Sequence, residues 1–228
     1  MRSTIRNVGL IIFALLVVAD LAGILMQYEP LHRCAKPLLM PALFFTVLFS
    51  TANAKGKWLI LIGLLFSFAG DVFLLYDQQY PVFFILGLVS FLITHVLYIL
   101  FFLRIPSVNK TSLLKKYPGL LILILLYVGS LLTLLFPYLE ALKIPVLLYA
   151  TVLGAMLLAA LHAFSRLERK AAVSFAIGAA FFVLSDSLLA IDKFYAPFVL
   201  AGFWIMLTYC VAQLFIVIGF CNYSGKLH

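Results

Sequence analysis

Long apolar runs alternate with short polar segments along the whole chain. Eight of these runs are long enough to cross a hydrocarbon core of roughly 30 Å as α-helices. The second run is the shortest, so its ends are the least well defined by the pattern. The chain is therefore predicted to be an all-α polytopic membrane protein, a single integral membrane domain (residues 1–228) with eight transmembrane helices at residues 7–27, 37–52, 57–76, 81–103, 118–138, 142–164, 171–191 and 197–219.

Composition excludes a soluble globular domain. Of the 228 residues, 66% are hydrophobic and only 11% are charged, a balance typical of polytopic membrane proteins. The longest predicted loop, residues 104–117, is too short to hold a soluble domain. Any chemistry must therefore take place in or beside the membrane.

The basic residues predict the orientation, because positive loops are retained in the cytoplasm. Eight helices place both termini on one side, and twelve of the sixteen basic residues fall on that side. The net charge of +8 is thus explained by topology rather than by a nucleic-acid partner. We expect cytoplasmic termini, in the inner membrane if the source is bacterial. The twelve are Arg2, Arg6, Lys55, Lys57, Arg104, Lys110, Lys115, Lys116, Arg166, Arg169, Lys170 and Lys226, and the other four are Arg33, Lys36, Lys143 and Lys193.

The first run has two interpretations. A basic start followed by an apolar stretch, with Val17 and Ala19 before a possible cleavage point, resembles a signal peptide. The apolar stretch continues through Leu21 to Met26, which is long for a signal core and favours an uncleaved helix. Cleavage would leave seven helices with the loops on the same sides.

Proline positions bear on the class of function. All nine prolines are expected in loops or near helix ends, with none in the middle of a span. Interrupted helices are typical of secondary transporter sites, so this pattern counts against transport.

Three aspartates lie inside predicted spans, where a carboxylate costs on the order of 2.5 to 3.5 kcal/mol. Asp20, Asp71 and Asp186 belong to helices that all run outward in the predicted topology. Each lies about 7 to 10 Å before the outer end of its helix at the helical rise. The three carboxyl groups are therefore predicted to share one depth in the outer half of the membrane.

The surroundings of Asp71 and Asp186 repeat at an offset of 115 residues. Such a repeat predicts two four-helix halves related about the membrane normal. Small residues seven positions apart share a helix face and permit close packing. We therefore expect the third and seventh helices to approach each other and to bring the two acids to one pocket. The matched pairs are Gly63 and Gly178, Phe66 and Phe181, Gly70 and Ser185, Asp71 and Asp186, Leu74 and Leu189, and Asp77 and Asp192.

A simpler role for each aspartate is an interhelical hydrogen bond, and for Asp20 this alternative stays open. His95 and Tyr98 share a face of the fourth helix, and His95 is either functional or a buried hydrogen-bonding histidine. Other polar side chains are candidates for lining the pocket, with packing roles as the alternative. These are Tyr149, Tyr209 and Gln213.

Several segments, in order from the second helix to the eighth, resemble the YhhN-type lysoplasmalogenase family. The most specific are the Gly-Asp and Ser-Asp motifs. This resemblance implies an eight-helix membrane enzyme that cleaves the vinyl ether bond of lysoplasmalogens to a fatty aldehyde and glycerophosphoethanolamine or glycerophosphocholine, with Asp71 and Asp186 as its paired acids. The segments are Lys36 to Pro41, Gly70 with Asp71, His95 with Tyr98, Phe182 to Ser187, and Tyr209 with Gln213.

Two carboxyl groups suit this reaction, because one donates a proton to the alkene while the other stabilises the cation and activates water. Lys36, at the outer mouth of the second helix, and Arg33 beside it are candidates for binding the substrate phosphate; for Lys36 an outward, snorkelling orientation is the alternative. We expect no metal, no cofactor and no obligate protein partner, and a single-chain ether lysophospholipid as substrate. The alternative function is a transporter or binding protein for a small amphiphile.

Overall fold

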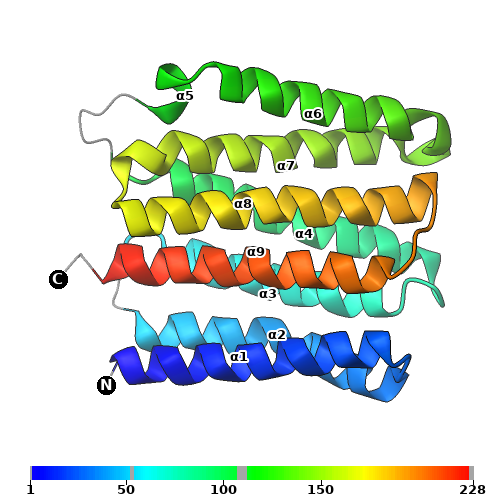
Figure 1. The fold of residues 1–228 in the computed structure, drawn as a ribbon, viewed down its shortest axis with the longest axis horizontal. Helices are drawn as coiled ribbons and strands as arrows, with labels where there is room; N and C mark the ends of the chain where they lie inside the picture. Colours follow the sequence, from blue (N-terminus) through cyan, green and yellow to red (C-terminus); the bar gives the residue numbers. More distant parts are fainter. Residues whose placement is uncertain (1, 52–53, 107–111, 226–228) are drawn as a thin grey trace. The chain divides into compact units, whose positions relative to one another are not determined.

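Helices account for all the regular secondary structure in the described part of the chain. The computed structural model describes residues 2–51, 54–106 and 112–225 (Figure 1). Eight of its helices are long and apolar enough to cross a membrane, which confirms the predicted fold class. They are α1 (Arg2–Leu25), α2 (Glu29–Ser50), α3 (Lys57–Leu75), α4 (Pro81–Leu103), α6 (Gly119–Leu135), α7 (Lys143–Ala163), α8 (Arg169–Ala190) and α9 (Ala201–Ser224).

Five shorter helical segments flank these spans. A single turn, α5 (Leu113–Lys116), precedes α6, and its first turn is capped by the Ser112 hydroxyl, which accepts a hydrogen bond from the Leu114 amide at 3.3 Å. The π-helical segment Ile191–Tyr195 continues α8 without a break. The other three are 3₁₀ turns at Phe136–Tyr138, Glu140–Leu142 and Phe164–Arg166.

The second helix corrects two predictions. It begins at Glu29 rather than at residue 37, and it contains Pro37 and Pro41 in its interior, so the prediction that no proline interrupts a span was wrong. Each of these prolines removes one backbone hydrogen bond, a loss that membrane helices tolerate when neighbouring groups satisfy the freed carbonyls. The helix nevertheless runs on to Ser50. Proline placement therefore no longer counts against a transporter.

A lysine ties the end of α2 to the start of α3. The Nζ atom of Lys57 donates hydrogen bonds to the carbonyl oxygens of Leu48 at 2.8 Å and Thr51 at 3.1 Å. Leu48 is in the last turn of α2 and Thr51 is its C-cap residue, and carbonyl groups at this end of a helix lack intrahelical partners and attract cations. Lys57, the first residue of the predicted third helix, thus begins α3 and also caps the preceding helix.

The structure divides into two compact units. The first comprises Met1–Arg104 with Phe220–His228, of which the described residues form α1 to α4 and the end of α9. In this unit α1 packs beside α2, α2 beside α3, and α3 beside α4. Asp71 therefore lies on α3, which packs between α2 and α4, its neighbours in the sequence.

The second unit comprises Ile105–Gly219. Here α7 packs between α6 and α8, and the segment around α5 is held to α7 by a contact of 2.9 Å between the Ser112 hydroxyl and Nδ1 of His162. Residues 201–219 of α9 lie against α8, as the contacts of Gly178 and Ser185 show. Asp186 thus lies on a helix with partners in α6, α7 and α9.

Candidate functional site

Three consecutive polar residues of α8 make hydrogen bonds to three different helices. Ser185 donates to the carbonyl oxygen of Ile205 on α9 at 3.1 Å. Asp186 accepts a hydrogen bond of 2.6 Å at Oδ2 from the hydroxyl of Tyr149 on α7.

The third residue, Ser187, accepts a hydrogen bond of 2.9 Å from the hydroxyl of Tyr127 on α6. Its own hydroxyl donates to the Val183 carbonyl one turn earlier, at 2.6 Å. Because successive residues of an α-helix are about 100° apart around its axis, the three side chains leave α8 in three directions. Hydrogen bonds therefore connect the segment around Asp186 to α6, α7 and α9.

The face of α8 that carries Ser185 packs closely on α9. A Cβ atom placed on Gly178 would lie 2.9 Å from the Ala212 carbonyl oxygen and 2.9 Å from the Ile216 amide nitrogen. One turn before Ser185 lies Phe182, whose ring meets that of Tyr209 edge to face at 5.8 Å. Glycine is required here because the two helix backbones approach each other directly.

In the first unit, Asp71 lies on α3 with only 2% of its surface exposed. One turn before it, the Ser67 hydroxyl lies 3.1 Å from that of Thr94 on α4, and Thr94 donates to the Gly63 carbonyl at 3.0 Å. The α3 and α4 helices are thus joined by hydroxyl groups immediately beside the acid.

The small residues of α3 serve the packing of α4. A Cβ atom on Gly63 would lie 2.6 Å from the Tyr98 ring, and one on Gly70 would lie 2.6 Å from the Phe91 ring. In each unit, therefore, the helix that carries the repeated motif packs its glycine-bearing face against the next long helix: α3 against α4, and α8 against α9. From the sequence, these small residues predicted that the third and seventh helices approach each other. Because they pack against α4 and α9 instead, they no longer support that prediction.

Each acid lies four or five residues before the last α-helical residue of its helix, although beyond Asp186 the helical backbone continues through the π-helical segment to Tyr195. Asp71 lies four residues before Leu75, the last residue of α3, and Asp186 lies four residues before Ala190, the last residue of α8. Asp20 lies five residues before Leu25, the end of α1. The repeated motif thus places Asp71 and Asp186 at the same distance from the last α-helical residue, but the helical span beyond Asp186 is longer.

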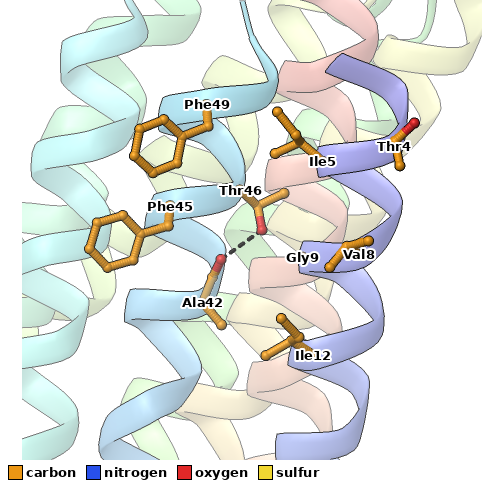
Figure 2. A pocket seen from close by; sticks show the side chains of 9 residues that line it. All are labelled: Thr4, Ile5, Val8, Gly9, Ile12, Ala42, Phe45, Thr46 and Phe49. Atoms are coloured by element: carbon orange, nitrogen blue, oxygen red, sulfur yellow. Dashed lines mark hydrogen bonds between the residues drawn. The ribbon is translucent and has the colours of Figure 1, made fainter. Parts of the chain in front are cut away.

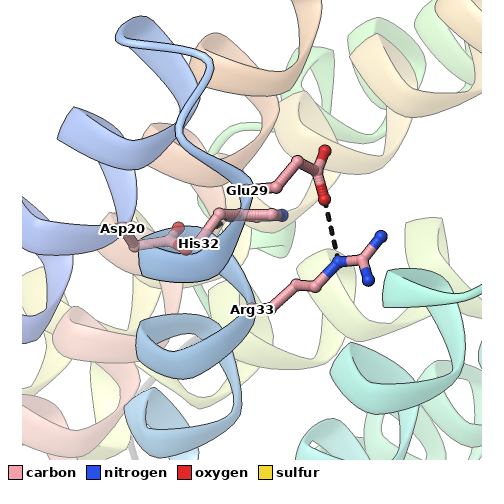
Figure 3. A network of polar contacts seen from close by, with 4 residues as sticks. All are labelled: Asp20, Glu29, His32 and Arg33. Carbon is pink, nitrogen blue, oxygen red and sulfur yellow. Dashed lines mark hydrogen bonds and ion pairs between the residues drawn. The ribbon is translucent and has the colours of Figure 1, made fainter.

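Asp20 has a partner that the sequence did not suggest (Figure 3). Its Oδ1 atom lies 2.8 Å from Nδ1 of His32 on α2, and the carboxyl group is fully buried. Its Oδ2 atom makes no hydrogen bond to any described residue. His32 was missed because the second helix was predicted to begin at residue 37. The interhelical hydrogen bond to His32 is the simpler role that the sequence analysis left open for Asp20.

The Asp20–His32 contact predicts a double-mutant signature. His32→Ala leaves a buried carboxyl group without its partner, so the free energy of unfolding should fall by about 1 to 3 kcal/mol. Adding Asp20→Leu removes the buried polar group, and the double variant should recover part of that loss. Thermal unfolding in detergent measures both; equal losses in the single and double variants would contradict a coupled pair.

The two candidate phosphate ligands differ in their surroundings. Arg33 is exposed, and its Nε atom donates to Glu29 at 2.8 Å one turn earlier on α2 (Figure 3). Lys36 does not lie at the mouth of the helix, because α2 begins seven residues before it. Its side chain is 8% exposed, so it is not an outward, snorkelling lysine either.

The other candidate residues are buried in their own units. His95 and Tyr98 of α4 have no exposed surface, and the Tyr98 ring packs over Gly63. Gln213 is equally buried on α9, and Tyr209 lies against α8. Among the candidate residues, Tyr149 and Asp186 are joined by a hydrogen bond.

An apolar groove of about 420 Å³ lies between α1 and α2 (Figure 2). Its walls include Ile5, Val8, Ile12 and Phe45, and none of its nine lining residues can titrate. The hydroxyl of Thr46, which also faces it, donates to the Ala42 carbonyl at 2.6 Å (Figure 2). The groove thus suits a hydrocarbon chain but offers no group for acid or base chemistry.

Comparison with known proteins gives a consistent set of relatives. A model of the YhhN family matches residues 31–220. The protein named lysoplasmalogenase TMEM86A is 33% identical in Bos taurus and 32% in Homo sapiens, over 160 residues that cover 70% of this chain. Lysoplasmalogenase TMEM86B of Homo sapiens is 35% identical over 193 residues, 84% of this chain and 74% of its own length. The match spans 63% of the length of the TMEM86A proteins, and no solved structure matches the chain.

Proposed function

Because the chain belongs to the YhhN family, we propose that it hydrolyses the vinyl ether bond of lysoplasmalogens. The products are a fatty aldehyde and glycerophosphoethanolamine or glycerophosphocholine. The observation that carries the proposal is the similarity of this chain to relatives named lysoplasmalogenase. The two acids of the repeated motif, on α3 and α8, support it.

The chemistry of a vinyl ether suits a pair of carboxyl groups. Proton transfer to the outer alkene carbon gives an oxocarbenium ion, which water captures as a hemiacetal that collapses to aldehyde and alcohol. One carboxyl group must donate the proton, and an ionised one must stabilise the cation and accept a proton from water. We assign these tasks to Asp71 and Asp186, which the proposal requires to reach the same substrate.

The proposed substrate is a single-chain lipid that enters from the outer leaflet. The excess of basic residues in alternate loops supports cytoplasmic termini, which places the acids in the outer half of the membrane. Of the basic residues used for this orientation, Lys110 and Lys226 lie outside the described residues. Arg33 remains the proposed ligand of the phosphate, with the vinyl ether several ångströms deeper, and Lys36, seven residues into α2, remains a proposed substrate-binding residue at about the depth of the acids.

Product formation tests the proposal. Purified protein incubated with an alkenyl lysolipid should release fatty aldehyde, and should leave the matched ester and saturated ether lipids intact. In D2O the aldehyde should carry one deuterium on the carbon next to the carbonyl, because that carbon receives the transferred proton. Mass spectrometry of the trapped aldehyde measures both results.

The same experiment separates the enzyme from the alternative function. Binding of the alkenyl lysolipid, or its uptake into vesicles, without release of aldehyde would contradict a hydrolase. It would support a transporter or binding protein whose intramembrane acids carry protons or contact the substrate.

A further inference from the structure

The groove between α1 and α2 has a lining that suits one hydrocarbon chain. Its volume of about 420 Å³ lies within the range of small-molecule sites in proteins. One wall is aromatic, because the rings of Phe45 and Phe49 stack with their centroids 5.9 Å apart and an angle of 8° between their planes (Figure 2). The facing wall is aliphatic and includes Val8 and Ile12 of α1. The groove therefore offers apolar contacts from two sides.

Small residues form the base of the groove, where the two helices touch. A Cβ atom placed on Gly9 of α1 would overlap the hydroxyl oxygen of Thr46 on α2 and lie 3.1 Å from the Thr46 Cβ atom. The Thr46 hydroxyl donates its proton to the Ala42 carbonyl oxygen at 2.6 Å. The base thus presents no free hydroxyl donor to a bound molecule, which again favours hydrocarbon as the occupant.

The groove begins at the ends of both helices and runs into the membrane span. Thr4 lies in the first turn of α1 and Phe49 in the last turn of α2, and both belong to its lining. From Thr4 to Ile12 the groove follows eight residues of α1, which is about 12 Å at the helical rise. A chain that descends from the membrane surface would therefore lie along its length. The lining side chains that are about half exposed are Val8, Ile12, Phe45 and Phe49.

The charges of the first unit favour an anionic lipid at this end of the groove. Arg6 follows the groove residue Ile5 on α1 and is partly buried. Basic residues near a membrane surface attract anionic lipid headgroups. The described basic residues at this end of the unit are Arg2, Arg6, Lys55, Lys57 and Arg104. The four acids in the sequence of the unit all belong to its opposite end, and they are Asp20, Glu29, Asp71 and Asp77.

From these features we propose that the groove binds one acyl chain of an anionic phospholipid, whose phosphate group lies at the basic end beside Arg6. This lipid comes from the leaflet at the basic end, whereas the proposed substrate enters from the opposite leaflet. Asp20 lies eight residues beyond Ile12 on α1, so the lipid site is separate from the acids of the unit and does not rest on the proposed function. A lipid that binds the folded protein stabilises the packing of α1 on α2.

Native mass spectrometry of the purified protein, titrated with phosphatidylglycerol in detergent, tests the site. The double variant Phe45→Ala, Phe49→Ala removes the aromatic wall, and both side chains are about half exposed, so the fold should survive. Its affinity for phosphatidylglycerol should fall about tenfold or more, because two large apolar contacts are lost. The matched control is Ile122→Ala, Leu126→Ala, which truncates two exposed residues one turn apart on α6, outside the groove. Its affinity should stay within about twofold of wild type.

The headgroup part of the proposal is tested at Arg6. Wild-type protein should bind phosphatidylglycerol more tightly than phosphatidylcholine with the same chains. Arg6→Gln should reduce this preference about fivefold, the usual contribution of one basic residue near a membrane surface, and should leave the affinity for phosphatidylcholine unchanged. Arg169→Gln removes a basic residue that begins α8, outside the groove, and should keep the preference. An undiminished preference in Arg6→Gln would overturn the placement of the phosphate.

Thermal unfolding gives a second measurement that needs only folded protein. Phosphatidylglycerol should raise the unfolding temperature of wild type and of the α6 control, and should leave that of the groove variant nearly unchanged. Equal lipid affinities, or equal rises in unfolding temperature, in the two double variants would overturn the proposal. A dimer that forms without bound lipid and dissociates in the groove variant would also overturn it, because the groove would then bind a second copy of the chain.

Discussion

Replacing either Asp71 or Asp186 by asparagine is expected to reduce kcat/KM by about a thousand-fold, because each variant loses a group that donates or accepts a proton in the reaction. Asparagine keeps the shape of the side chain, and its carbonyl oxygen still accepts a hydrogen bond from Tyr149 at position 186. Both variants should therefore remain folded. Aldehyde release from an alkenyl lysolipid measures the loss.

The repeat supplies matched controls for this prediction. Asp77 and Asp192 follow the two proposed catalytic acids by six residues, outside α3 and within the π-helical segment after α8. Asp77→Asn and Asp192→Asn should therefore retain most of the wild-type activity. Wild-type rates in Asp71→Asn or Asp186→Asn would refute the catalytic role of that residue.

Gly178→Leu is expected to have the largest effect on stability. The new side chain would meet backbone atoms of Ala212 and Ile216, which no rotamer change can move aside. Overpacking on this scale should lower the free energy of unfolding by about 3 kcal/mol or more. Thermal unfolding in detergent measures the loss.

Two other glycines provide the comparison. Gly129→Leu on α6 should be tolerated, because a Cβ atom at Gly129 has no neighbour within 4 Å. Gly63→Leu should cost less than Gly178→Leu, since it meets the ring of Tyr98 rather than backbone. Similar unfolding temperatures for all three variants would contradict the packing described for α8 and α9.

The eight helices could be predicted from the sequence because the length and hydrophobicity of each apolar run do not depend on the rest of the fold. The start of α2 was mispredicted for the opposite reason: it is the least apolar of the eight spans. Its first turns contain His32 and Lys36, and these polar residues lie in the helix with tertiary surroundings that bury them fully or in part. A hydropathy pattern does not detect a helix end that is stabilised by a partner such as Asp20.

The candidate acids stand out in the sequence, whereas their hydrogen-bond partners do not. An aspartate inside an apolar run stands out in one sequence, and the repeat at 115 residues singled out Asp71 and Asp186. Tyr149 is separated from Asp186 by 37 residues and lies on another helix, and no local periodicity relates the two. Contacts of this kind depend on how each helix is rotated about its axis, which a single sequence leaves open.

The three-way anchoring of α8 has a consequence for catalysis. Rotating α8 about its axis would break the bonds of Ser185, Asp186 and Ser187 to three other helices together. These bonds fix the rotation of α8, so the proposed catalytic carboxyl group of Asp186 would need little reorganisation when a substrate binds. Enzymes gain much of their rate from dipoles and charges whose orientation was settled during folding.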